Sequence, residues 1–216
     1  AAATLTIEAN AVTDNPLVFA DTGAEYQEDP DGRWPSTLNW CIQLAAHYGY
    51  PLTVVRNPRR TLKQEIRERR RFPAPATRWC STHHKRNQIW KYIRTIDAEH
   101  IISIQGHRAD ESDFRRGMPP WEIIPDLCAR RARTTGRPRT VWNWLPIHHW
   151  GLHDVLDYVA EQGIELHPIY RFLDRLSCEV CIYHGPRHFS ATRKNNRRAF
   201  DEYNRLEREL GFTVSM

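Results

Sequence analysis

Residues 17–26, LVFADTGAEY, are the stretch on which our interpretation of the fold depends. Four apolar or small residues run directly into Asp21, Thr22 and Gly23, and a run that ends at such a polar, glycine-containing turn is typical of a buried strand. In open α/β sheets, ligands bind just beyond the carboxyl ends of the strands. Asp21 can accept hydrogen bonds from a ribose or an adenine amino group there, and Gly23 lets a ligand approach the backbone closely. The alternative is an ordinary turn that the aspartate caps.

Strands and helices alternate along the rest of the chain. Further buried strands are predicted at 52–55, 100–105 and 140–147, and helices at 1–10, 35–48, 62–71, 83–96, 151–162 and 186–210. This alternation predicts an α/β fold with a parallel sheet, in which the strand ends at Asp21, Gly106 and His148 meet at one edge. Residues 113–139 are basic, contain proline and show no clear period, so we expect a mobile lid or binding loop there.

The composition is that of an ordinary globular chain with a basic bias. Of 216 residues, 40% are hydrophobic and 26% are charged, which argues against an intrinsically disordered protein. No apolar run is long enough for a membrane span and no signal-peptide pattern opens the chain, so we expect a cytoplasmic protein with no membrane partner. The net charge is +5, and 27 of the 31 basic residues are arginines, which bind phosphate or sulfate through a bidentate guanidinium. This bias supports a nucleotide or nucleic-acid partner.

The cysteines form a pattern that suits thiol or metal chemistry better than disulfides. Cys178 and Cys181 form a C-x-x-C pair, and Cys80 follows an arginine-containing loop far from them in sequence. Three thiolates can hold an iron–sulfur cluster with one open iron, or a zinc ion with a histidine as fourth ligand. The candidate histidines are His83, His84 and His184. Alternatively, the C-x-x-C pair is a redox dithiol, or the three thiols are unrelated buried cysteines.

Four arginines are candidate ligands for a phosphate or a sulfate: Arg108, Arg115, Arg116 and Arg175. Arg108 lies two residues after Gly106, where its guanidinium can hold a phosphate that a glycine turn cradles. Arg175 lies three residues before Cys178, so an anion bound there would be near the thiols. The alternative for each is a solvated surface arginine, which must be true of most of the arginines in the chain.

Several segments follow one another in an order that we associate with one family. They are VFADTGAEY, HYGYPLTVVR, RWCSTHHK, GHRADES, PIHHWGLHDVLDYVAEQGIELHPIY and RLSCEVC. Together they resemble the phosphoadenosine phosphosulfate (PAPS) reductase family of the adenine nucleotide alpha-hydrolase, or PP-loop, superfamily, over nearly the whole chain up to residue 183. The chain is especially similar to members from DNA phosphorothioation and phage systems, in which this fold supports sulfur transfer.

The resemblance implies a Rossmann-like, five-stranded parallel sheet with helices on both faces, which binds an adenine nucleotide. It places Asp21, Thr22 and Gly23 near the adenosine, and Gly106 and Arg108 at the phosphates. It implies that Cys80, Cys178 and Cys181 carry a [4Fe–4S] cluster, as in many members, with zinc as the alternative.

Two departures from the family pattern affect these expectations. The pyrophosphate loop, SGGKDS or similar, is absent, and the predicted helix at 1–10 is the element that should follow it. We therefore expect that residues 1–183 are a nucleotide-binding domain without its first strand and PP-loop, which would lie upstream of Ala1. No cysteine follows Cys181, whereas the assimilatory reductases use a tail cysteine as the nucleophile. Residues 184–216 are expected to form a charged helix that packs on this domain or extends from it.

These observations favour an enzyme that uses ATP or an adenylyl sulfate, most simply a sulfurtransferase that adenylates its substrate. Mg²⁺ would accompany ATP, and a sulfur-donor protein, DNA or tRNA, or a second copy of the chain are candidate partners. One alternative is the reduction of a phosphoadenylyl or adenylyl sulfate to sulfite. A second is a non-catalytic nucleotide- or nucleic-acid-binding module in which the cysteines hold a structural metal.

Overall fold

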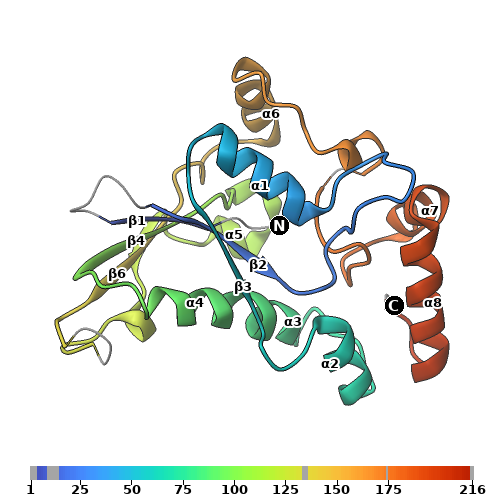
Figure 1. Cartoon of the computed structure of the whole chain (residues 1–216), viewed down its shortest axis with the longest axis horizontal. Helices are drawn as coiled ribbons and strands as arrows, with labels where there is room; N and C mark the ends of the chain where they lie inside the picture. Colours follow the sequence, from blue (N-terminus) through green and yellow to red (C-terminus); the bar gives the residue numbers. More distant parts are fainter. Residues whose placement is uncertain (1–3, 9–14, 133–135, 174, 215–216) are drawn as a thin grey trace.

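The computed structural model describes residues 4–8, 15–132, 136–173 and 175–214. Its centre is a six-stranded sheet in the order β3-β2-β1-β4-β6-β5 (Figure 1). The strands are β1 (Thr4–Glu8), β2 (Leu17–Asp21), β3 (Leu52–Arg56), β4 (His100–Gln105), β5 (Trp121–Ile123) and β6 (Thr140–Trp144).

Four of the strands run in one direction. β2 pairs in parallel with β3, β4 pairs in parallel with β6, and β1 is antiparallel to both β2 and β4. The carboxyl ends of β2, β3, β4 and β6 therefore share one edge, which confirms the predicted α/β fold and the meeting of these strand ends. β5 is a short antiparallel strand beside β6.

The predicted helix at residues 1–10 is wrong, because Thr4–Glu8 form β1 (residues 1–3 and 9–10 lie outside the described chain). The strand fills the position between β2 and β4, and Thr4 pairs with both Val18 and Gln105. In the segment TLTIE, polar and apolar residues alternate, and threonine and isoleucine are β-branched, so it suits a strand. The sheet thus has one strand more than the family resemblance implies.

Helices cover both faces of the sheet, as Figure 1 shows for α1 and α4. α1 (Thr37–His47) begins at Ser36, whose side chain accepts a hydrogen bond from the Asn39 amide. α2 (Leu62–Arg69) begins with a capping box between Thr61 and Gln64. α3 (Trp79–Ser81), the π-helical turn η1 (Thr82–Arg86) and α4 (Asn87–Ile93) follow without a break, and α6 (Leu152–Glu161) begins after Gly151.

The region that we expected to be an irregular lid, 113–139, contains ordered elements. They are α5 (Asp113–Arg116), β5 and the short 3₁₀ turn η3 (Pro125–Leu127). Leu127 is fully buried in a core cluster with Ile93, Ile101 and Val141. The expectation of an irregular segment is therefore wrong for its described part, because it contains regular elements and Leu127 packs in the core, while its role as a lid or binding loop stays a prediction.

The single charged helix predicted at 186–210 is two helices, α7 (Pro186–Asn195) and α8 (Arg197–Leu210). Asn196 separates them, and its side chain accepts a hydrogen bond from the Ala199 amide at the start of α8. α8 buries a stripe of one residue per turn that includes Tyr203 and Leu206, which pack against Leu62 and Ile66 of α2. The domain boundary at residue 183 stays a prediction.

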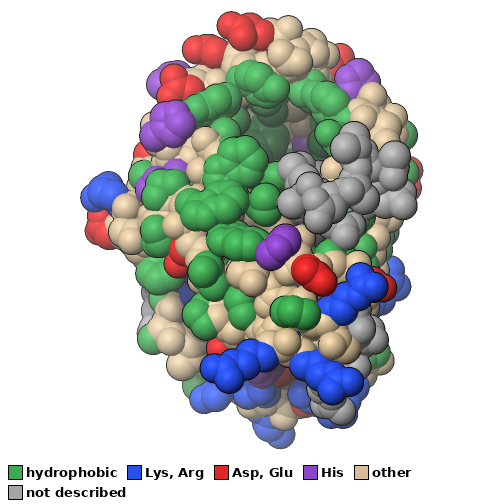
Figure 2. Space-filling view, turned by 90° about the vertical axis from the view of Figure 1, so that its left-hand side faces the viewer, with side chains coloured by type: hydrophobic (Ala, Val, Ile, Leu, Met, Phe, Trp, Pro, Cys, Tyr) green, Lys and Arg blue, Asp and Glu red, His purple; other side chains and the backbone are tan. Residues whose placement is uncertain are grey.

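The outer surface is mixed in character. The face in Figure 2 carries many hydrophobic side chains, with lysine and arginine side chains grouped toward its lower end. Exposed large hydrophobic residues include Phe114, Trp121 and Ile123. Within the described ranges, no helix has the length and apolar character that a membrane crossing requires.

Candidate functional site

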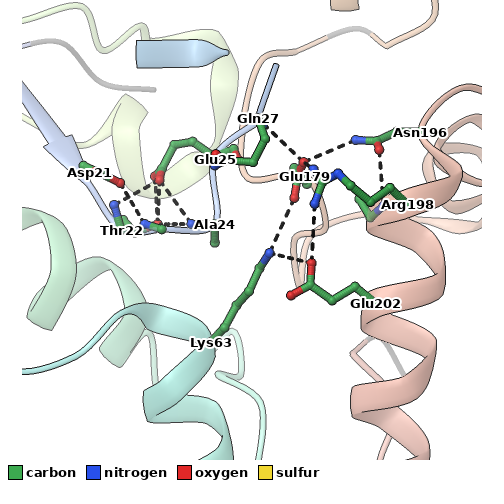
Figure 3. Close-up of polar contacts among 12 residues, drawn as sticks. Asp21, Thr22, Ala24, Glu25, Gln27, Lys63, Glu179, Asn196, Arg198 and Glu202 are labelled. Atoms are coloured by element: carbon green, nitrogen blue, oxygen red, sulfur yellow. Dashed lines mark hydrogen bonds and ion pairs between the residues drawn. The ribbon is translucent and has the colours of Figure 1, made fainter. Parts of the chain in front are cut away.

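The turn after β2 is held by its own acidic side chains. The carboxylate of Asp21 accepts a hydrogen bond from the Gly23 amide at 2.9 Å. The buried carboxylate of Glu25 accepts from the amide of Thr22 at 2.9 Å, from its hydroxyl at 2.8 Å and from the Ala24 amide at 3.3 Å (Figure 3). Gly23 has a φ of +73°, which favours glycine. These bonds fix the backbone of the predicted adenosine-binding segment.

The same turn contacts the C-x-x-C segment. Glu25 and Cys178 pair in an isolated antiparallel bridge, and the Glu179 amide donates to the Ala24 carbonyl at 2.9 Å. The Lys85 ammonium lies 3.8 Å from the Glu25 carboxylate. The structure therefore joins the end of β2, η1 and the C-x-x-C segment at one place.

All three predicted cysteines gather at this place. Cys80 and Cys178 pack against the same apolar cluster, and the charges of Cys80, Cys181, Glu25 and Lys85 all act on Cys178. We call these five residues the thiol centre. Each of its three thiols is free and partly buried.

Burial and charge set the protonation of the thiol centre. Burial raises the pKa of Cys178 to about 12, although the Lys85 charge opposes this rise. Burial also raises the pKa of Cys80. Burial would lower the pKa of Lys85, but the negative charges that Cys178 and Glu25 can carry hold it above its usual value. Lys85 is therefore a cation that faces thiols and a carboxylate.

The three thiols do not form a metal site as they are placed here. Among the described residues, no group of three or more His, Cys, Asp and Glu side chains is arranged to hold a metal ion. The donor set also has one thiolate fewer than the four that usually hold a [4Fe–4S] cluster. An iron–sulfur cluster or a zinc ion at these cysteines therefore stays a prediction from the sequence.

A second buried carboxylate anchors the C-x-x-C segment. The side chain of Glu179, which lies between the two cysteines, is fully buried and pairs with Arg198 of α8. It also accepts from the Gln27 amide at 3.3 Å, and Lys63 of α2 lies 3.6 Å away (Figure 3). Figure 3 shows these partners between the β2 turn and α8, so the segment is tied to both.

The predicted anion-binding arginines all have partners within the chain. Arg108 Nε bonds Asp110 at 3.0 Å, and Arg115 pairs with Glu111. Glu111 also accepts from the Arg108 amide at 3.0 Å, so the structure brings Arg108 and Arg115 together after β4. The remaining two contact other groups: Arg116 bonds Asp113 at 2.7 Å, and Arg175 donates to the Tyr183 carbonyl at 2.9 Å.

Arg78 connects these arginines with the thiol centre. Its guanidinium lies over the Tyr183 ring, 5.3 Å from the centroid, and its charge acts on Cys80. Burial lowers the pKa of His107, and the charges of Arg115 and Arg78 lower it further. The charge of Arg78 therefore acts both on the thiol centre and on the residues after β4.

Our sequence analysis missed three residues here: Glu25, Arg78 and Lys85. All of them lie within segments quoted for the family resemblance, VFADTGAEY and RWCSTHHK. Their nearness in sequence to Asp21, Thr22 and Cys80 was visible, but their contacts depend on the tertiary fold. A separate hollow of about 460 Å³ along α6 contains none of the predicted site residues; its lining is His149, Trp150, Asp154, Asp157, Tyr158 and Glu161.

Comparison with known proteins adds one strong match. A sequence model described as the phosphoadenosine phosphosulfate reductase domain matches residues 1–183. Among solved structures, the chain is similar to a crystal structure of phosphoadenylyl-sulfate (PAPS) reductase from Candida auris in a phosphate complex. The identity is 13%, the match covers 77% of this chain and 70% of that chain, and the TM-score is 0.46. No curated protein matches the chain. The family match spans all the described strands and the C-x-x-C pair.

Proposed function

The chain belongs to the phosphoadenosine phosphosulfate reductase domain family, and from that premise we propose that it is an adenine-nucleotide-dependent sulfurtransferase. The observation that carries this proposal is the pairing of the β2 turn with the C-x-x-C segment. It supports a site in which a nucleotide and reactive sulfur meet.

In the proposed reaction, an oxygen atom of the acceptor attacks the α phosphorus of ATP. The bond between the α phosphorus and the bridging oxygen breaks, and pyrophosphate leaves; Mg²⁺ bound with ATP would neutralise part of its charge. A hydrosulfide ion from the sulfur donor, held in the thiol centre, then attacks the carbon that bears the adenylated oxygen and forms a carbon–sulfur bond, with loss of its proton to solvent. The carbon–oxygen bond breaks and AMP leaves, so ATP supplies the leaving group and a sulfur donor supplies the sulfur.

The described residues have separate roles in this proposal. Asp21 and the backbone at Gly23 contact the adenosine, because they lie at the carboxyl end of β2, at the edge where ligands bind. Arg108 and Arg115 stabilise the negative charge that develops on the phosphates. The charge of Lys85 acts to lower the pKa of Cys178 and Cys80, against the burial that raises it. The net charge of +5 supports an anionic acceptor such as DNA or tRNA.

Analysis of the nucleotide products tests the proposal. The protein is incubated with radiolabelled ATP, Mg²⁺, sulfide and either total tRNA or DNA, and in parallel with PAPS and a dithiol reductant. We expect AMP from ATP that depends on the acceptor and that is lost in Cys181→Ser but kept in Cys128→Ser, the matched control. Sulfite from PAPS without AMP formation from ATP would assign the reductase reaction instead. Nucleotide binding without either product would identify a binding module.

A further inference from the structure

Glu65 of α2 is a fully buried carboxylate with four basic neighbours. It accepts from Arg69 Nε at 2.7 Å and contacts His83 Nδ1 at 2.9 Å and His84 Nε2 at 2.8 Å, while Arg60 Nε lies 3.6 Å away. Burying a carboxylate is costly unless its charge is compensated and its oxygens are hydrogen-bonded. Both conditions are met here, but neither histidine belongs to the nucleotide edge or to the thiols. The network therefore calls for a different explanation.

The two histidines are consecutive, and the residue after them is Lys85. All three lie in the π-helical turn η1. In an α-helix, neighbouring side chains diverge by about 100°, so they do not ordinarily reach one carboxylate. The wider π turn brings both imidazoles to Glu65. With His83 and His84 both held at Glu65, the next residue, Lys85, meets Glu25 at 3.8 Å.

The protonation of the network is consistent with this arrangement. Burial lowers the pKa of His84, which favours its neutral form. Its Nδ1 atom is buried and has no hydrogen-bond partner among the described residues, so the proton belongs on Nε2 and is donated to Glu65. The contact to His84 is thus a directional hydrogen bond to a carboxylate.

We propose that Glu65 is a positioning residue, which fixes the rotation of η1 and thereby directs the Lys85 ammonium toward Glu25 and the cysteines of the thiol centre. The inference rests on the proposed function, because it concerns the same site. Its test measures the environment of Lys85, whereas the test of the function measures the reaction products. A failure of one is therefore distinguishable from a failure of the other.

Competitive trace acylation of the lysines at one fixed pH, followed by peptide mass spectrometry, tests the proposal. The chain has four lysines, so Lys63, Lys91 and Lys194 are internal references for Lys85. In Glu65→Gln, we expect the labelling rate of Lys85 to rise by roughly threefold or more, because the turn loses its anchor and the ammonium leaves Glu25. The rate of Lys63, on the same helix as Glu65, should not change.

Glu68→Gln is the matched control, since it removes an exposed carboxylate from the same helix. It should leave the labelling of Lys85 unchanged. If Glu65→Gln does not fold, His83→Asn takes its place, because His83 is only partly buried and its loss removes one of the anchoring bonds. A Lys85 rate that equals that of the native protein in a folded variant would overturn the proposal, and so would an equal rise at all four lysines.

Discussion

Glu25 and Cys178 lie opposite each other in an antiparallel bridge. Beside this bridge, the Gln27 amide donates a hydrogen bond to the carboxylate of Glu179, which lies 152 residues further along the chain. The bridge links the turn after β2 with the C-x-x-C segment. Because Glu25 also holds Thr22 and faces Lys85, one carboxylate connects the predicted nucleotide edge with the thiol centre.

Replacing Glu25 with glutamine should weaken this connection. The amide keeps one acceptor oxygen, but it loses the charge that faces Lys85 and part of the bonding to Thr22 and Ala24. We expect the free energy of unfolding to fall by about 1–3 kcal/mol in urea titrations. Glu28→Gln, a change at an exposed position, should stay within about 0.5 kcal/mol of the native protein. Equal values for the two variants would contradict this role of Glu25.

Gly23→Ala should destabilise the protein more than Gly49→Ala. Both glycines have a similar positive φ, +73° and +70°, so both substitutions carry the backbone penalty of about 1–2 kcal/mol. A Cβ atom at Gly23 would also lie 3.0 Å from Cβ and Cγ2 of Thr61, whereas one at Gly49 meets nothing within 4 Å. We expect an additional loss of about 1 kcal/mol at Gly23 in thermal or urea unfolding. The same loss in both variants would show that the contact with Thr61 relaxes freely.

Arg108→Gln should weaken nucleotide binding more than Arg116→Gln. The Arg108 side chain is 15% exposed and lies beside Arg115 and Glu111 after β4, whereas the Arg116 side chain is 66% exposed and pairs with Asp113. Loss of one charge-assisted contact to a phosphate is expected to raise the Kd for ATP by roughly tenfold. Isothermal titration calorimetry measures both variants, and a larger effect at Arg116 would move the phosphate site away from Arg108.

Ionised Glu65 should stabilise the folded protein, and this stabilisation should be lost in acid. Burial alone would raise its pKa, but the hydrogen bonds from Arg69, His83 and His84 lower it from 4.5 to about 2. A pKa that is lower in the folded state stabilises the protein above pH 4.5, and this stabilisation is lost as the pH falls toward 2. The contribution is about 3 kcal/mol. Urea titrations between pH 6 and pH 3 should therefore show a smaller pH dependence for Glu65→Gln than for the native protein.

Glu68→Gln is the control for that measurement, because Glu68 is exposed and pairs with Arg60 but not with the histidines. A native-like pH dependence in Glu65→Gln would mean that Glu65 does not titrate as its contacts require.

The sequence was sufficient for the elements with a strong local pattern. β2, β4 and β6 are apolar runs that end in polar turns, and α1 and α6 carry clear helical patterns. β1 was missed because AAATLTIEAN begins with helix-favouring alanines, while its strand pattern covers only TLTIE. This segment forms a strand because it pairs with β2 on one side and β4 on the other, and a local sequence pattern carries no information about such pairing.

The candidate site, too, could be predicted only in part from the sequence. The three cysteines could be identified from their spacing and from the family resemblance, and the structure brings them together. The buried carboxylates could not, because Glu65 meets His84 and Glu179 meets Arg198 only in the tertiary fold. Buried polar contacts between separate segments of the chain leave no periodic signal in a single sequence.

The central claim is that the nucleotide edge and the thiol centre form one site. The alkylation rate of each cysteine, measured by mass spectrometry with and without saturating ATP or PAPS, tests it most directly. We predict that the nucleotide slows the alkylation of Cys80, Cys178 and Cys181 by roughly threefold or more and leaves Cys41 and Cys128 unchanged. Unchanged rates at all five cysteines, with binding of the nucleotide shown by equilibrium dialysis, would contradict the claim.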